Sequence, residues 1–115
     1  MTPKELKDRT KRFAVDVVRL ARELPNTVDG RRIGQQFLDA GTSVAANYRS
    51  ACRARSRAEF IAKMGVVEEE SDETRFWLEL MVDSKLVTQQ RAEKLMKEAD
   101  ELTAIMVASL KTAKR

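Results

Sequence analysis

The chain has 115 residues, of which 43% are hydrophobic and 35% charged, and its formal net charge is +4. This length suits one domain with a single core, and the composition excludes a disordered chain. The absence of histidine removes the usual nucleophile pairs and the helical di-iron ligands, and the single cysteine, Cys52, excludes an internal disulfide and a thiol-rich metal site. No apolar run reaches the roughly 18 residues of a membrane span, and Met1–Leu24 is too charged for a signal peptide, so we expect a cytoplasmic protein without membrane contact.

The two halves of the chain differ in charge. Residues 1–57 contain 13 Lys and Arg against 6 Asp and Glu, whereas residues 58–115 contain 9 against 12. A basic half either attracts an external anion or meets the acidic surface of another copy, and the sequence leaves both readings open.

The first predicted helix spans about residues 3–24. Its core positions are spaced by four and three residues in turn, which is typical of one buried stripe in a helical bundle. Pro3 suits a first helical turn, where its missing N–H costs nothing, and Pro25 prevents continuation. The stripe consists of Leu6, Thr10, Phe13, Val17, Leu20 and Leu24.

The second predicted helix spans about residues 30–54 and repeats this spacing. Gly34 and Gly41 each lower its intrinsic stability by roughly 1 kcal/mol, so we interpret them as sites of close helix packing. The stripe consists of Ile33, Phe37, Ala40, Val44, Asn47 and Ala51.

The third predicted helix spans about residues 57–85. Ser56 and Glu59 have the spacing of a capping box, in which two free N–H groups at a helix start find partners. Two stripe positions, Ser71 and Thr74, are small and polar, and we expect them to face a hydrogen-bonding partner. The apolar members are Phe60, Met64, Val67, Leu78 and Met81.

The fourth predicted helix spans about residues 89–112, with Thr88 as its N-cap. Its stripe consists of Ala92, Leu95, Ala99, Leu102, Met106 and Ser109. Short connections favour antiparallel neighbours, and no strand alternation or repeat is present, so the sequence predicts an all-α, up-down-up-down four-helix bundle in which residues 1–115 form one domain.

The run Glu68–Glu73 is the most acidic segment, and Glu69, Asp72 and Glu73 share one helical face. Such a face could hold a hard cation, but a solvated surface or a subunit contact is the favoured interpretation, because a helix supplies few converging oxygens. Since the sequence also has no Gly-rich phosphate loop and no spacing that assigns catalytic roles, we predict no enzyme activity, no catalytic residues, no cofactor and no metal site.

A basic cluster at the end of the second helix is the main candidate for binding. Arg49 and Arg53 are helical neighbours, and Arg55 and Arg57 follow in the turn, where they would clamp phosphate oxygens. A solvated surface or salt bridges between subunits explain them equally well. Tyr48 is the one nearby aromatic residue for base stacking, and Cys52 between arginines is interpreted as a buried thiol rather than a reactive one.

Four apolar residues lie off the core stripes. Val15 and Val18 fall on the outer side of the first helix, and Trp77 and Leu80 on a shoulder or the outer side of the third. We predict that they form an oligomer interface anchored by Trp77.

Several blocks of the sequence resemble one family. The segment Thr42–Arg49, followed by Ala51–Ser56 and Ala58–Phe60, is similar to the four-helix bundle proteins of the 23S ribosomal RNA intervening-sequence family. Glu68–Thr74 and Trp77–Leu80 extend the resemblance over nearly the whole chain. Where many relatives have Ser-Ile-Pro-Ala-Asn-Ile-Ala-Glu-Gly, this chain has Ser43–Ala51 without the proline or the acidic residue, so the helix is expected to run straighter and to end more basic.

The resemblance implies a small left-handed bundle that assembles with itself into a ring-like pentamer, is encoded in a bacterial genome and has no catalytic residues. A more distant likeness to a retroelement accessory protein adds RNA-linked scaffolding. Asn47 matches the polar position of the family motif, and we expect it to form a buried hydrogen bond with Ser71 and Thr74 that sets helix register, in preference to a ligand contact.

These observations support a non-enzymatic homo-oligomer that binds RNA or a nucleoprotein through the surface containing Arg49, Arg53, Arg55 and Arg57. The alternative hypothesis is a protein-interaction scaffold whose charge asymmetry serves self-assembly and partner docking.

Overall fold

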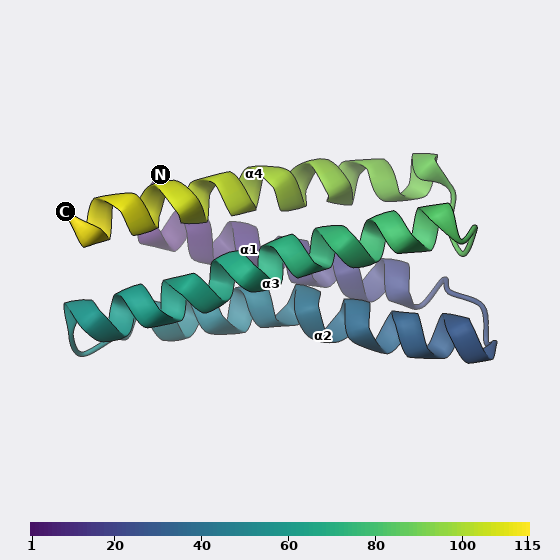
Figure 1. Cartoon of the computed structure of the whole chain (residues 1–115), viewed down its shortest axis with the longest axis horizontal. Helices are drawn as coiled ribbons and strands as arrows, with labels where there is room; N and C mark the ends of the chain where they lie inside the picture. Colours follow the sequence, from purple (N-terminus) through teal and green to yellow (C-terminus); the bar gives the residue numbers. More distant parts are fainter.

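The computed structural model describes every residue from Met1 to Arg115 and contains four α-helices and no strand. They are α1 (Pro3–Ala21), α2 (Val28–Ala51), α3 (Arg57–Asp83) and α4 (Gln89–Lys114). The helices alternate in direction along a rod of 45 × 21 × 20 Å, and both chain termini and the α2–α3 turn lie at the same end (Figure 1). The predicted all-α up-down-up-down bundle is therefore confirmed. No helix has the length and apolar character that a bilayer crossing requires.

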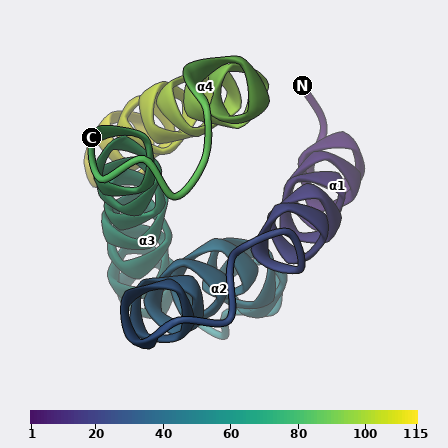
Figure 2. The ribbon, with the colours of Figure 1, turned by 90° about the vertical axis from the view of Figure 1, so that its right-hand side faces the viewer.

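The helices are not packed equally against one another. Each packs along its chain neighbour, whereas α1 and α4, which close the ring of helices, touch only sparsely. In end view α1 stands diagonally across from α3, with α2 between them (Figure 2). The outward faces of α1 and α3 therefore point in opposite directions.

The core follows most of the predicted stripes in α1, α3 and α4, but Leu24, Phe60 and Ser109 are only partly buried. In α4 the last buried residue is Leu110, one position beyond the predicted Ser109. Phe13, Leu78 and Leu102 are among the side chains that solvent does not reach. In α2 the stripe shifts, so that Gly41 and Tyr48 are buried while Ile33 and Asn47 are only partly buried. A straight helix of 3.6 residues per turn drifts away from a seven-residue pattern, and this drift brings Tyr48 inward.

The starts of α1, α3 and α4 are as predicted, and the other five helix limits differ from the predicted ones by two or three residues. The backbone tightens into three-residue turns after Ala21 and after Ala51, where the amides of Leu24 and Ala54 bond to the carbonyls of Ala21 and Ala51. Pro25 disfavours helical geometry at the residue before it, which explains the early end of α1. The second helix begins early because Thr27 caps it, its hydroxyl accepting the Gly30 amide at 3.1 Å.

The capping box predicted at Ser56 forms only in half. The Ser56 hydroxyl accepts the Glu59 amide at 3.0 Å, but the Glu59 carboxylate accepts the Arg55 amide instead of the Ser56 amide. A complete box lies at the start of α1, between Thr2 and Glu5.

The expected register hydrogen bond between Asn47 and the third helix is not formed. The Asn47 amide donates to the Ser43 carbonyl at 2.9 Å, one turn back on its own helix. The Ser71 and Thr74 hydroxyls likewise donate to carbonyls of α3, at 2.9 and 2.7 Å. Short polar side chains in a helix bond readily to the carbonyl four residues earlier, and this local bond replaces the predicted contact between helices.

Candidate nucleic-acid interface

Positive charge gathers at the end of the bundle that carries both termini and the α2–α3 turn. The segments that form this end, residues 1–11, 43–63 and 107–115, contain 12 Lys and Arg against 3 Asp and Glu. The rest of the chain contains 10 against 15. The up-down-up-down fold brings these three basic segments to one end of the rod, and a mild charge difference between the sequence halves thus becomes a strong one along the rod.

A groove of about 720 Å³ runs between α1 and α2 at this basic end. Its walls carry four cations and one carboxylate, and its floor is made of the small α2 residues Thr42, Ala45 and Ala46. Lys4, Lys7 and Lys11 follow one another along one side of α1, and Arg49 reaches in from α2; the carboxylate is Asp8.

Most of these groove cations are free of protein partners. Lys4 pairs with Asp8 at 3.3 Å, an exposed pair in which both side chains are largely solvated. Lys7, Lys11 and Arg49 form no ion pair and no side-chain hydrogen bond within the chain. Small residues on the floor let an anionic chain approach the α2 backbone closely, so the groove suits a run of phosphates.

The four predicted arginines do not form one clamp. Arg49 lines the groove, while Arg53 is exposed in the turn without an ion-pair partner. Arg55 points into solvent, with Glu59 at 3.9 Å. The Arg57 guanidinium donates to the backbone carbonyls of Ala113 and Arg115 and so caps the C-terminus of α4. The prediction from the sequence did not include Lys4, Lys7 and Lys11. Their spacing, which places them along one side of α1, could have identified them.

Tyr48 is unavailable for base stacking because only 5% of its surface is exposed. Burial, together with the adjacent Cys52 thiol, raises the pKa of its phenol. Both residues border a mostly apolar pocket of about 390 Å³ at the end of the bundle, and Cys52 is a partly buried free thiol.

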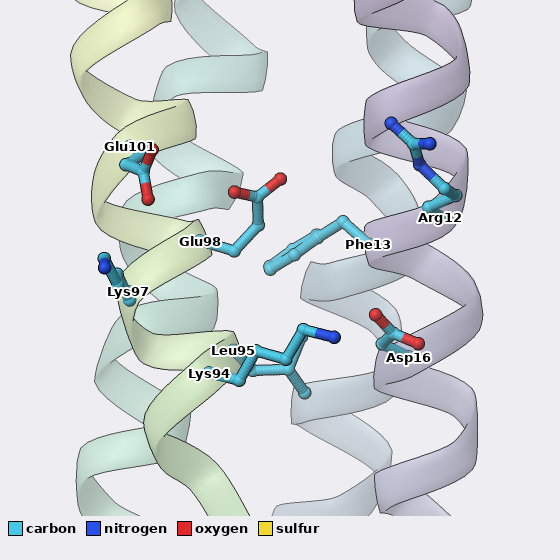
Figure 3. A pocket seen from close by; sticks show the side chains of 8 residues that line it. All are labelled: Arg12, Phe13, Asp16, Lys94, Leu95, Lys97, Glu98 and Glu101. Atoms are coloured by element: carbon cyan, nitrogen blue, oxygen red, sulfur yellow. The ribbon is translucent and has the colours of Figure 1, made fainter.

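A second cleft, of about 470 Å³, lies along the open contact between α1 and α4. Figure 3 shows Phe13 reaching across from α1, with Glu98 and Lys94 extending from α4 and Asp16 on the α1 side. Its three cations are balanced by three carboxylates. Glu98 accepts both the Nε and a terminal nitrogen of Arg9, at 2.7 and 2.6 Å, which raises the pKa of that guanidinium. The Arg9–Glu98 ion pair joins α1 to α4 at this cleft. Because the lining charges balance, the cleft has no net attraction for an anion.

The predicted interface residues lie on two separate faces. Val15 is 40% exposed and Val18 partly exposed on α1, whereas Leu80 is partly exposed on α3. Trp77, the predicted anchor, packs partly against the core, and its indole donates to Glu73 at 3.2 Å. Its neighbour Phe76 is the larger exposed surface at 51%, and the two rings meet edge to face at 5.0 Å. No three metal-ligating side chains come together anywhere, the acidic run included.

Comparisons with known proteins point to one family. A family model described as 23S rRNA-intervening sequence protein matches residues 4–108. A crystal structure from Bacteroides thetaiotaomicron, described as a protein of unknown function from the S23 ribosomal protein family, is 34% identical in sequence. It superposes with a TM-score of 0.86 over 91% of this chain and 97% of that one. No curated protein matches the chain.

Proposed function

Because the chain belongs to the family of 23S rRNA-intervening sequence proteins, we propose that it binds RNA through its basic end, without catalysing a reaction. The observation that carries this proposal is the groove between α1 and α2, where Lys7, Lys11 and Arg49 have no partner in the protein. The excess of nine positive charges at that end supplies the long-range attraction, and the acidic remainder of the rod orients the approach.

The groove would act on the RNA backbone rather than on its bases. Lys7 and Lys11 lie one helical turn apart, about 6 Å along α1, so each would meet a separate phosphate. Lysine and arginine contacts to phosphate release condensed counterions and carry no sequence information. Binding is therefore expected to depend strongly on salt and weakly on sequence, with Arg53 and Arg55 adding contacts from the turn.

The test is RNA binding by fluorescence anisotropy over a series of salt concentrations, with the double variant Lys7→Ala/Arg49→Ala. Removal of two phosphate contacts should reduce the slope of log K against log salt by about 1.4 for a single strand. Lys94→Ala/Lys97→Ala is the matched control, because it removes the same charge from the α1–α4 cleft. The control should retain most of the slope.

Two results would contradict the proposal. Wild-type protein that binds no RNA at low salt would remove it altogether. Equal losses in the groove variant and the control would mean that net charge, not the groove, attracts the RNA. The variant Arg53→Ala/Arg55→Ala tests the turn separately and should weaken binding without abolishing it.

We also propose that the protein works as a homo-oligomer, and the family resemblance favours a ring-like pentamer. Exposed apolar side chains on two faces of the rod support self-association, because they lie outside the core of the monomer and a second copy could cover them.

A further inference from the structure

The outer faces of α1 and α3 have a similar composition with opposite charge. Val15 is the exposed apolar centre of the α1 face, and its neighbours three and four residues away are Lys11, Arg12, Val18 and Arg19. Phe76 is the exposed centre of the α3 face, and its corresponding neighbours are Asp72, Glu73, Glu79 and Leu80. Each face thus has two apolar residues, the central one and one of its neighbours. Three charged residues of the same sign surround them.

These two faces cannot meet within one molecule. Helices α1 and α3 occupy diagonal corners of the bundle, and their outer faces point away from each other (Figure 2). The charges on the α1 face form no ion pair in the chain; Lys11 at its edge also borders the groove, whereas Arg12 and Arg19 lie outside it. A second copy is the partner that matches both faces at once.

We propose that the α1 face around Val15 binds the α3 face around Phe76 of a neighbouring copy. This rests on the self-association proposed above and assigns its geometry. The contact joins two different surfaces, so one copy keeps its α3 face free and the other keeps its α1 face free. A series of copies therefore closes into a ring or continues as a filament. In a ring closed about an axis along the rods, rotation alone relates the copies. Because α1 and α3 run in the same direction within one copy, the joined copies would then stand parallel, with their basic ends on one side.

The contact is tested by replacing the apolar centre of each face with a carboxylate. Val15→Glu and Phe76→Glu should each block assembly, leaving monomers in sedimentation velocity at a concentration where the wild type is oligomeric. The two variants mixed together should form a dimer, because each retains the face that the other has lost. Val28→Glu is the control, since Val28 is 74% exposed at the start of α2 and belongs to neither face.

The outcomes separate this contact from self-association in general. A wild type that stays monomeric at all concentrations would overturn both proposals. Oligomers that survive in both variants would overturn the α1–α3 contact alone. A third outcome is that only one of the two variants blocks assembly and that mixing the variants does not restore it. The interface would then join one face to the same face of another copy. Circular dichroism of each variant identifies any loss of folding, and the mixing experiment then uses Val18→Glu or Leu80→Glu in its place.

Discussion

Glu70 lies in an environment that disfavours its charge. It lies on the partly buried side of α3, and burial raises the pKa of its carboxyl, with further contributions from Glu73, Glu69 and, across the helix contact, Asp39. A raised pKa means that the folded state holds this proton more tightly than the unfolded state. The ionised carboxylate therefore destabilises the fold above that pKa, and the penalty disappears at acid pH.

We predict that Glu70→Gln raises the melting temperature slightly at pH 7 and leaves it unchanged below about pH 4, where the carboxyl is protonated in both states. Thermal unfolding at both values checks this. Glu93→Gln makes the same chemical change on the exposed side of α4 and should shift neither melting temperature in this way. If Glu70→Gln raised the melting temperature equally at both pH values, the raised pKa of Glu70 would not be the cause.

At the level of elements, one glycine decides how closely α2 packs on α1. A Cβ atom built at Gly41 would lie 2.6 Å from both methyl groups of Val17, which is fully buried. Valine is stiff at this position, so the methyl groups cannot move aside cheaply. Gly65 in α3 offers the contrast, because a Cβ there meets no atom within 4 Å.

Gly41→Ala is therefore expected to lower the free energy of unfolding by about 1–2 kcal/mol, since overpacking costs more than the roughly 1 kcal/mol gained in helix propensity. Gly65→Ala should raise it by up to about 1 kcal/mol. Urea unfolding of the two variants checks both signs. Stabilisation by Gly41→Ala would show that α1 and α2 can separate without penalty.

At the level of the whole molecule, the fold places charge along the rod and apolar patches across it. The basic groove lies at one end, while Phe76 belongs to the side of α3. If copies join side by side with parallel axes, the grooves of several copies can bind the same RNA molecule. Several connected sites bind one RNA far more tightly than a single site does.

We therefore predict that Phe76→Glu weakens binding to a long RNA by about 100-fold through lost multivalency, although Phe76 lies outside the groove. Binding to an RNA too short to span two copies should change little. Anisotropy with both lengths, at a protein concentration where the wild type is assembled, makes the comparison. Equal weakening for both lengths would indicate a direct role of Phe76 in RNA binding.

Periodicity and capping residues were enough to predict the bundle. Most members of the stripes of α1, α3 and α4 are buried as expected, because an amphipathic helix buries its apolar side. Thr88 caps α4, as the sequence indicated, and its hydroxyl accepts a hydrogen bond from the Arg91 amide at 3.2 Å. Sequence reasoning failed where a side chain had a choice of partner, as for Asn47, which bonds to its own helix, and Arg57, which caps α4.

The candidate site depended far more on tertiary structure. The sequence identified Arg49 and a basic first half, and local spacing determined these because charges three and four residues apart share a helical face. Only the packing of α1 against α2 brought Lys4, Lys7 and Lys11 to the side of Arg49, 38 to 45 residues further along the chain, and only tertiary packing buried Tyr48. The sequence by itself thus determined the helices and the sign of their surfaces, because both follow from residues close together in the chain. Tertiary structure decided which surfaces meet, because antiparallel packing joins segments that no local pattern connects.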